Sequence, residues 1–356
     1  MTYVCANVAI ETYGCSANQN NSEIMAGLLE KAGFAVINVK DKNFSWSCLA
    51  DVVILNTCVV KGPTLKRMER RLMDLLLNDK KVVVAGCMGK VYRERIEKIK
   101  KEIEKIKNKR VNLIVVDEIK HIVGAVSHLQ NLQNLKTKTE NKSNIQKDFV
   151  ILTKYKKRIN KVIGIHQIAT GCLSNCSFCV TKIAKGYLKS FDEDGIVKNI
   201  EQDIKEGCKE IWLTATDVSC YGLDNGKYML VSLLNKISSI KGKFFVRIGM
   251  LNPGHVINYI DELLAIYEDQ KIFKFIHLPL QSASDKVLKE MKRNYSKKDF
   301  IEIAKKFKQK FPQGTLATDI ITGFYNEDED DFNETIELVK HIQPDIINIS
   351  RFWPMP

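Results

Sequence analysis

The chain has 356 residues, enough for two domains with separate hydrophobic cores, and no apolar run approaches the roughly 18 residues of a membrane span. Because the N-terminus lacks the basic and apolar regions of a signal peptide, we expect a cytoplasmic protein without a membrane partner, in which ten cysteines favour metal or redox chemistry over disulfides. The net charge of +13 is compatible with a polyanionic partner such as RNA, although a lysine-rich proteome gives the same excess.

Residues 1–126 alternate short apolar runs with helical patterns, which is typical of a parallel sheet covered by helices on both faces. The strand-like runs are Val8–Tyr13, Val52–Asn56, Val82–Ala85 and Leu113–Val116, and the helical stretches include Ser22–Ala32, Thr64–Leu77 and Tyr92–Lys109. The sequence therefore predicts an N-terminal α/β domain over this range.

Three cysteines of this domain come just after predicted strands: Cys15, Cys58 and Cys87. The carboxyl ends of parallel strands open onto one edge of a sheet, so we expect the three thiols to lie together. Gly14 and Gly86 give the backbone the freedom that tight turns around a bulky group require. This pattern favours a three-ligand iron–sulfur cluster over the alternative of cysteines packed in the core. Four other cysteines lack the arrangement and are interpreted as structural: Cys5, Cys48, Cys208 and Cys220.

Residues 127–161 are rich in Asn, Gln, Lys and Thr, a composition typical of a linker between domains. The basic run Lys154–Lys161 lies at the end of this segment. It has two interpretations, a solvated connection and a contact with phosphate groups.

Residues 162–356 resume the alternation of strands and helices, and the six strand candidates predict a partial (β/α)6 barrel. The first strand ends near Thr170, and the others are Ile211–Thr214, Phe244–Ile248, Phe275–Leu278, Thr318–Ile321 and Ile346–Ser350. Active sites of such folds lie at the carboxyl ends of the strands.

The loop after the first of these strands contains Cys172, Cys176 and Cys179 in a C-x3-C-x2-C pattern. Thiolates select iron–sulfur clusters or zinc, and both kinds of closed site normally use four ligands. Three cysteines can hold three irons of a 4Fe–4S cluster and leave the fourth iron open to S-adenosylmethionine. The alternative is a zinc knuckle completed by a ligand from elsewhere in the chain.

Together with their surroundings, the two cysteine sets resemble the methylthiotransferases of the radical-SAM superfamily over nearly the whole chain. In the N-terminal domain the resemblance rests on Thr12–Cys15, Asn18, Ser22-Glu23, Asn56–Val59 and Ala85–Met88. In the barrel it rests on Gly171–Cys179, His277–Ser282, Met291–Arg293 and Thr318–Phe324.

The resemblance implies two 4Fe–4S clusters, one on each cysteine set, with Cys172, Cys176 and Cys179 as the catalytic set that activates S-adenosylmethionine. Members of the family add a methylthio group to an unactivated carbon of a tRNA base or of a ribosomal protein. The segments Thr181–Gly186 and Arg247–Val256 resemble the archaeal and eukaryotic branch, which acts on threonylcarbamoyladenosine at position 37 of tRNA. The isopentenyladenosine and ribosomal-protein branches are the alternatives.

Five further residues are candidates for binding S-adenosylmethionine: Phe178, Thr214, Asp217, Arg247 and Gln281. Thr214 and Asp217 end a strand at which this superfamily contacts the methionine moiety. Phe178 could equally be a core aromatic residue, Arg247 could line the barrel, and Gln281 could serve a hydrogen bond at the barrel rim.

The resemblance implies that relatives continue beyond the barrel into an RNA-binding TRAM domain, for which the sequence given shows no counterpart. We expect one of three explanations: the sequence is a fragment, a separate RNA-binding subunit supplies this part, or the basic surface alone holds RNA. The resemblance also implies an electron donor such as ferredoxin or flavodoxin. Two alternatives belong to other classes. A different radical-SAM enzyme should lack the N-terminal cysteine set, and a non-catalytic RNA-binding scaffold should hold no cluster.

Overall fold

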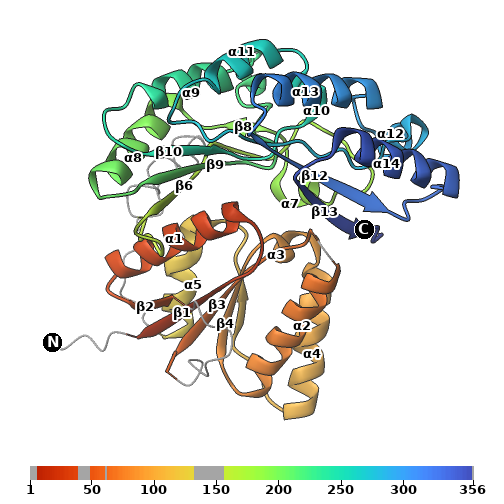
Figure 1. Ribbon diagram of the computed structural model, residues 1–356. Helices are drawn as coiled ribbons and strands as arrows, with labels where there is room; N and C mark the ends of the chain where they lie inside the picture. Colours follow the sequence, from red (N-terminus) through yellow and green to blue (C-terminus); the bar gives the residue numbers. More distant parts are fainter. Residues whose placement is uncertain (1–5, 39–48, 61, 132–155, 355–356) are drawn as a thin grey trace. The chain divides into compact units, whose positions relative to one another are not determined.

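The computed structural model describes residues 6–38, 49–60, 62–131 and 156–354, and the chain divides into two compact units, residues 1–159 and 160–356. Figure 1 shows the elements of each unit. Most of the linker predicted at 127–161, namely residues 132–155, lies outside the described residues. Among the helices that are described, none is long and apolar enough to cross a membrane.

The first unit is built on a five-stranded sheet in which every neighbouring pair is parallel. Its strands are β1 (Asn7–Thr12), β2 (Ala35–Asn38), β3 (Val52–Thr57), β4 (Lys81–Gly86) and β5 (Leu113–Val115), in the order β2-β1-β3-β4-β5. In this order the direction of winding reverses between β1 and β3, and open α/β sheets bind ligands at the carboxyl ends of the strands at such a point. The predicted α/β architecture is confirmed.

Helices cover both faces of this sheet (Figure 1). They are α1 (Ser16–Lys31), α2 (Gly62–Leu77), α3 (Cys87–Val91), α4 (Arg93–Lys107), the 3-10 turn η2 (Ile119–His121) and α5 (Ile122–Leu129). Apolar residues of α1 and α5 share a core with alternate residues of β1, β3 and β4. The helices α2 and α4 pack side by side on the other face.

Two features of this unit differ from the sequence prediction. Strand β2 was not predicted, and α1 begins at Ser16 rather than Ser22. The first turns of α1 carry polar side chains that are nevertheless buried, including Asn18 and Asn20. Hydrophobic periodicity cannot detect a helical face of this kind, because the buried side chains are not apolar.

The structure describes residues 156–161 of the basic run Lys154–Lys161, of which 156–159 are half-buried while Asn160 and Lys161 are exposed. The side chain of Lys156 is 6% exposed and its Nζ lies 3.1 Å from Oε2 of the buried Glu23 on α1. The backbone N–H of Ile159 donates to the other carboxylate oxygen of Glu23 at 3.0 Å. Residues 156–159 therefore pack on α1, because they neutralise a carboxylate that would otherwise be buried with no counter-charge.

The second unit contains six parallel strands in two hydrogen-bonded sheets, β10-β9-β6 and β11-β12-β13. The strands are β6 (Ile163–Gln167), β9 (Glu210–Thr214), β10 (Phe245–Ile248), β11 (Phe275–His277), β12 (Thr315–Thr322) and β13 (Ile346–Arg351). Val246 joins the two sheets, because its N–H donates to Lys271 O at 2.7 Å and its carbonyl accepts from Phe273 N–H at 3.0 Å. The strands thus form a continuous curved wall, and the predicted partial barrel is confirmed.

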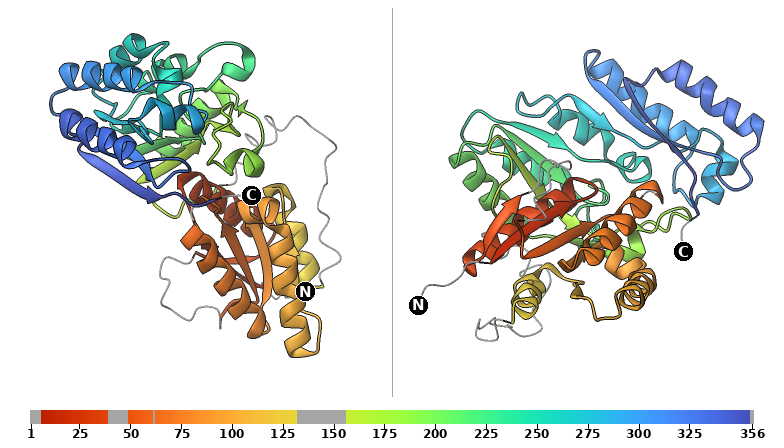
Figure 2. Two further views of the ribbon diagram at one scale, coloured as in Figure 1. Left: turned by 90° about the vertical axis from the view of Figure 1, so that its right-hand side faces the viewer. Right: turned by 90° about the horizontal axis from the view of Figure 1, so that it is seen from below.

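Helices cover the outer side of this wall (Figures 1 and 2). The longer ones are α8 (Glu193–Lys205), α9 (Leu230–Ser238), α11 (Ile260–Ile266), α13 (Lys297–Lys310) and α14 (Glu329–Ile342). The short helices α7 (Thr181–Lys185), α10 (Pro253–Val256) and α12 (Asp285–Glu290) and the 3-10 turn η3 (Leu223–Asn225) lie in the connections that follow strands. Side-chain caps define several of their starts: Ser296 and Asp328 form reciprocal capping boxes on α13 and α14. A short antiparallel pair, β7 (Ala169–Thr170) and β8 (Lys189–Ser190), lies on either side of the cysteine loop in the chain.

Candidate metal centres

The first cysteine set lies at the carboxyl ends of three adjacent parallel strands. Cys15 caps the start of α1 after β1, Cys58 follows β3 directly, and Cys87 is the first residue of α3 after β4. Burial raises the pKa of the Cys58 thiol, and the nearby thiols of Cys15 and Cys87 raise it further. The three cysteines that the sequence predicted to converge thus follow three neighbouring strands of the sheet, and their convergence on one cluster stays a prediction.

Glycine is required beside these cysteines because their loops pack closely. At Gly14, φ is +110° and a Cβ atom would lie 2.7 Å from Cβ of Cys58. At Gly86, φ is +84° and a Cβ atom would lie 2.5 Å from the carbonyl oxygen of Thr57. Both values are shorter than real carbon contacts allow, so the turns into Cys15 and Cys87 depend on glycine.

Two side chains with no role in the sequence prediction hold these loops in place. The Asn18 amide nitrogen donates to the carbonyl oxygens of Tyr13 at 2.7 Å and of Thr57 at 2.8 Å. It therefore ties together the two loops that carry Cys15 and Cys58. The Thr57 hydroxyl donates to Ala85 O at 2.5 Å and accepts from the N–H of Met88 at 3.0 Å, which links β3 to the Cys87 turn.

The second cysteine set occupies an irregular loop between β7 and α7. The Cys172 N–H donates to Gly186 O at 3.2 Å, and the Cys179 N–H donates to Cys176 O at 3.1 Å. At Gly171, φ is +74° and a Cβ atom would lie 1.9 Å from the carbonyl oxygen of Tyr187. Only glycine can stand at this position, where the strand pair β7–β8 closes the base of the loop.

The electrostatics of this loop oppose free thiolates. Burial raises the pKa of Cys172 to about 11, and the charge of Asp217 raises it further. The Cys176 thiol adds to the same effect. Thiolates in such an environment need positive charge to stabilise them, which bound iron supplies.

Among the described residues, no three His, Cys, Asp or Glu side chains come close enough together to hold one metal ion. The ligands of a zinc ion all bind the same atom, whereas each cysteine of a 4Fe–4S cluster binds a different iron. The assignment of the two cysteine sets to clusters stays a prediction from the sequence.

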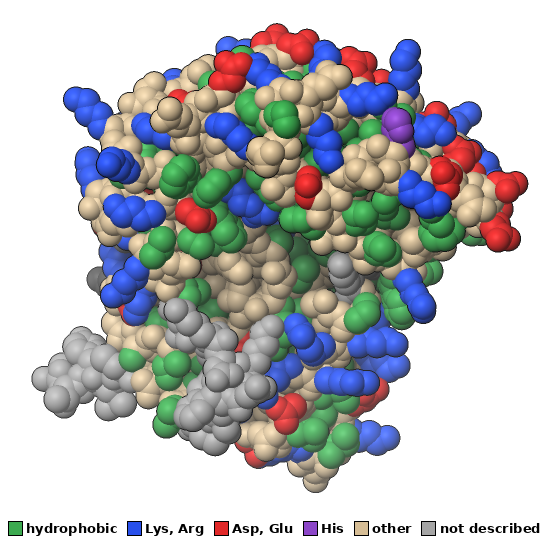
Figure 3. All heavy atoms as spheres, in the orientation of Figure 1, with side chains coloured by type: hydrophobic (Ala, Val, Ile, Leu, Met, Phe, Trp, Pro, Cys, Tyr) green, Lys and Arg blue, Asp and Glu red, His purple; other side chains and the backbone are tan. Residues whose placement is uncertain are grey.

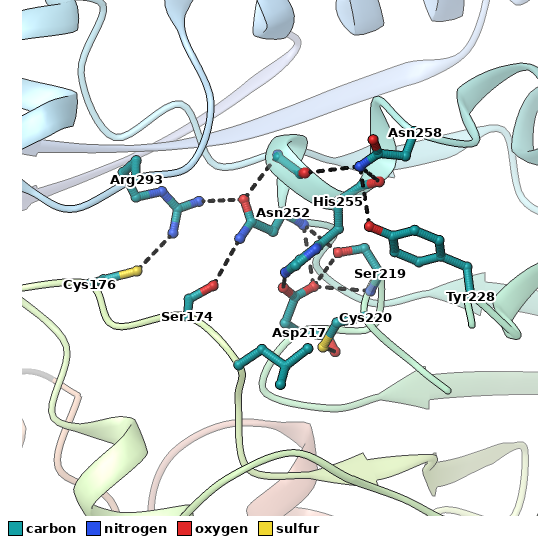
Figure 4. A network of polar contacts seen from close by, with 12 residues as sticks. Ser174, Cys176, Asp217, Ser219, Cys220, Tyr228, Asn252, His255, Asn258 and Arg293 are labelled. Atoms are coloured by element: carbon teal, nitrogen blue, oxygen red, sulfur yellow. Dashed lines mark hydrogen bonds and ion pairs between the residues drawn. The ribbon is translucent and has the colours of Figure 1, made fainter. Parts of the chain in front are cut away.

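Arg293 ties the second cysteine loop to the barrel (Figure 4). Its Nη1 donates to Sγ of Cys176 at 3.2 Å and its Nη2 donates to Oδ1 of Asn252 at 3.0 Å. The Asn252 amide nitrogen lies 3.3 Å from the Ser174 hydroxyl, within the same loop. Arg293 lies in a motif that the sequence singled out, but neither it nor Asn252 had a predicted role.

Asp217 is the buried acid of this network (Figure 4) and is 2% exposed. One carboxylate oxygen accepts from the N–H of Ser219 at 3.0 Å, from the Ser219 hydroxyl at 2.5 Å and from the N–H of Asn252 at 3.3 Å. The other oxygen has no hydrogen-bond partner among the described residues, and His255 Nε2 lies 3.9 Å from it. A buried acceptor without a partner carries a desolvation cost that a bound donor would remove.

The other candidate residues occupy different environments. Thr214 is buried at the end of β9. The Arg247 guanidinium stands over the rings of Trp212, at 5.0 Å from the centroid, and Phe275, at 4.6 Å, which corresponds to the barrel-lining interpretation. Phe178 packs with Val287, Met291 and Phe324, which corresponds to a core aromatic residue.

Gln281 has an unusual backbone conformation, with φ at +65°, and is buried. Its N–H donates to Asp319 O at 2.8 Å, and its carbonyl oxygen accepts from Ile321 N–H at 2.9 Å. The described backbone contacts of Gln281 thus connect it to β12. This corresponds to the interpretation as a hydrogen-bonding residue of the barrel rim.

Comparison with known proteins gives two family matches. Residues 167–339 match the radical SAM superfamily, and residues 7–107 match a family described as uncharacterized protein family UPF0004. Each match contains one complete cysteine set.

Curated relatives cover nearly the whole chain. A probable threonylcarbamoyladenosine tRNA methylthiotransferase of Pyrococcus abyssi is 41% identical over 352 residues, which are 98% of this chain and 77% of the relative. The corresponding protein of Archaeoglobus fulgidus is 40% identical over 97% of this chain and 76% of its own length. The human threonylcarbamoyladenosine tRNA methylthiotransferase is 34% identical over 98% of this chain and 57% of its own length.

Solved structures share the fold at low sequence identity. The radical S-adenosylmethionine methyltransferase TsrM of Kitasatospora setae matches with a TM-score of 0.67 at 12% identity, over 97% of this chain and 72% of the other. The cobalamin-dependent S-adenosylmethionine radical enzyme OxsB matches with a TM-score of 0.63 at 11% identity, over 98% of this chain and 53% of the other. These likenesses support the fold alone.

Proposed function

We propose that this chain, which belongs to the threonylcarbamoyladenosine tRNA methylthiotransferase family, converts N6-threonylcarbamoyladenosine at position 37 of tRNA into its 2-methylthio derivative by radical-SAM chemistry. The observation that supports the proposal is the placement of two sets of three cysteines, one after strands of the first unit and one in a single loop of the second. A radical enzyme without sulfur transfer would need only the site in the barrel.

The chemistry requires groups beyond ordinary side chains. Carbon 2 of adenine is aromatic and unactivated, so a cofactor must supply the radical and the protein must position it. When bound, a cluster on Cys172, Cys176 and Cys179 with S-adenosylmethionine would supply the radical chemistry, and a cluster on Cys15, Cys58 and Cys87 would supply the sulfur. Three protein ligands at each site leave a coordination position for a further molecule.

Residues of the barrel would orient S-adenosylmethionine. The Asp217 oxygen that lacks a partner is suited to accept a hydrogen bond from its ammonium group, because a charge-assisted bond to a buried carboxylate is strong. Thr214, three residues before Asp217, is the last residue of β9 and carries a hydroxyl group. Arg293 and Asn252 would hold the cysteine loop at a fixed place beside this carboxylate.

An electron donor such as ferredoxin or flavodoxin belongs to the proposal, because S-adenosylmethionine must receive one electron in each turnover and the thiols of the sites cannot supply it repeatedly. A separate RNA-binding subunit and a cytoplasmic location stay predictions from the sequence.

The test is mass spectrometry of tRNA nucleosides after incubation with anaerobically reconstituted protein, S-adenosylmethionine, a sulfur source and a reductant. The proposal predicts the 2-methylthio derivative of threonylcarbamoyladenosine, and a product only on isopentenyladenosine would contradict the substrate. Iron analysis should give about eight irons per chain. About four would indicate a radical enzyme without the first cluster, and none would indicate a scaffold.

Three cysteine variants make this test specific. Cys176→Ser should lose both cleavage of S-adenosylmethionine and tRNA modification. Cys58→Ser should keep the cleavage, lose methylthio transfer and retain about four irons. Cys208→Ser is the matched control, because this buried thiol lies outside both cysteine sets and donates to the carbonyl oxygen of Lys161 at 3.8 Å, and it should retain activity.

A further inference from the structure

The α2 basic surface, defined as Lys66, Arg67 and Arg70, is a cluster of exposed cations on the outer face of the first half of α2. The three residues are spaced so that they lie on one side of the helix, opposite Leu65, Met68 and Leu72, which are buried. Figure 3 shows Lys and Arg side chains gathered on this side of the first unit.

This surface lies at the edge of the sheet that carries the first cysteine set. Met68 Sδ accepts from the backbone N–H of Cys58 at 3.3 Å, so the first half of α2 touches that loop. The Arg67 guanidinium stands over the ring of Tyr13, 5.4 Å from its centroid, and Tyr13 lies two residues before Cys15. The cations of α2 therefore border the predicted sulfur-donating site within a single unit.

The neighbouring acidic side chains are engaged with other arginines. Glu69 pairs with Arg95 at 3.3 Å, while Glu11 and Asp74 both pair with Arg71, at 2.9 and 2.6 Å. Among the residues that the structure describes, neither Arg67 nor Arg70 forms an ion pair with a carboxylate. Two guanidinium groups are thus available for an anion from outside the chain.

We infer that the α2 basic surface binds backbone phosphates of the tRNA anticodon stem-loop and brings the target base toward the first cysteine set. Arginine suits this role because its planar fork binds phosphate oxygens through two hydrogen bonds. The inference rests on the proposed function, since it takes tRNA as the polyanion. It adds the surface of the first unit that holds this substrate.

The test measures the salt dependence of binding by fluorescence anisotropy, using cluster-loaded protein and unmodified tRNA at several KCl concentrations. Each phosphate contact releases counterions and adds between about 0.7 and 0.9 to the slope of log affinity against log salt. The double variant Arg67→Gln/Arg70→Gln should therefore lower the magnitude of the slope by between about 1.4 and 1.8. Its affinity should fall several-fold at low salt and less at high salt.

The matched control is Lys101→Gln/Lys105→Gln on α4, which removes the same net charge from exposed positions. These lysines lie in the second half of α4, where Lys107 donates to the carbonyl of Leu77 at the end of α2, away from the cysteine edge. The lysines there alternate with glutamates, which weaken the local potential. We expect the salt slope of the control to stay at the wild-type value.

Two outcomes would overturn the inference while leaving the proposed function intact. The first is an unchanged slope in the α2 variant, including an affinity loss of the same factor at every salt concentration, because a contact of that kind releases no counterions. The second is an equal loss of slope in the control. The thermal midpoint of the α2 variant should equal that of the wild type, and a lower midpoint with an unchanged slope would assign these arginines to folding. A wild-type protein that does not bind tRNA would instead contradict the proposed function.

Discussion

Replacing Arg293 by Gln should lower the reduction potential of the cluster held by the barrel. The guanidinium donates to Sγ of Cys176, one of the predicted cluster ligands, at 3.2 Å. Burial lowers the pKa of the Arg293 guanidinium, whereas Tyr295 and Cys176 raise it, and the net result is a pKa above the ordinary value, so the side chain stays charged. A fixed positive charge therefore stands beside a centre that gains negative charge on reduction.

The magnitude follows from Coulomb's law. For a separation of about 6 Å between the guanidinium and the added electron, and an effective dielectric constant of about 20, the interaction is about 3 kcal/mol. For a one-electron couple, 59 mV corresponds to a tenfold change in the equilibrium constant, so this energy equals a shift on the order of 100 mV. Solvent that reaches the partly buried side chain would reduce the shift, which makes the value an upper bound.

The assay is a potentiometric titration followed by electron paramagnetic resonance. A background with serine at Cys15, Cys58 and Cys87 leaves only the cluster of the barrel and removes overlap between the two signals. Arg293→Gln should move the midpoint to more negative potential at an unchanged iron content. Arg293→Lys keeps the charge and should restore most of the potential, although one ammonium cannot reproduce the fork that joins Cys176 to Asn252.

Three results would refute this reasoning. A midpoint that does not move in the Gln variant would show that the charge of Arg293 does not act on the cluster. Equal shifts in the Gln and Lys variants would show that the geometry of the guanidinium matters and its charge does not. Loss of iron in both variants would assign Arg293 to cluster assembly, and the predicted effect on potential would then be wrong.

Two further predictions concern stability. Gly86→Ala should destabilise the first unit by about 2–5 kcal/mol and lower its iron content. The backbone there has φ +84° and ψ −150°, and the new Cβ would meet a carbonyl oxygen at 2.5 Å. The control Gly33→Ala, at a residue with φ +91° and open space around it, should cost only about 1–2 kcal/mol in urea unfolding. Hydrogen bonds from Lys286 and Ser284 lower the pKa of Asp331 to about 2, below its unfolded value of about 3.9. This carboxylate therefore contributes about 2 kcal/mol to the free energy of unfolding, which is present above pH 4 and lost as the pH falls through 2. The difference in unfolding free energy between wild type and Asp331→Asn should therefore shrink from pH 5 to pH 2, and a constant difference would contradict the assigned cause.

Local patterns in the sequence were sufficient to predict both sheets and both cysteine sets. The run Val82–Ala85 is wholly apolar and buried, as expected for a parallel strand inside a doubly covered sheet. Cys87 comes at the end of that strand, so its place at the carboxyl edge follows from the strand alone. Such residues are predictable because the information that positions them lies within a few residues of them in the chain.

Residues that act through distant partners were missed for the converse reason. Arg293 is 117 residues from Cys176 and 41 from Asn252, and no local pattern indicates either contact. Asn18 bonds to the carbonyl of Thr57, 39 residues away, and this need for a buried amide explains why the start of α1 carries no apolar stripe. Strand β2 was missed because Ala35–Asn38 is short and only part of it is buried.

The order of strands in the first sheet explains how cysteines so far apart in sequence form one site. Cys15 and Cys58 are separated by 43 positions and Cys58 and Cys87 by 29, yet β1, β3 and β4 are neighbours because β2 pairs on the outer side of β1. If β2 instead lay between β1 and β3, the strand spacing of about 4.8 Å would move Cys15 away by one further strand. The reversal of winding between β1 and β3 also directs α1 and α2 to opposite faces, so neither helix covers the edge between Cys15 and Cys58. The predicted three-thiol site thus depends on topology, whereas the predicted site of the barrel depends on one short loop.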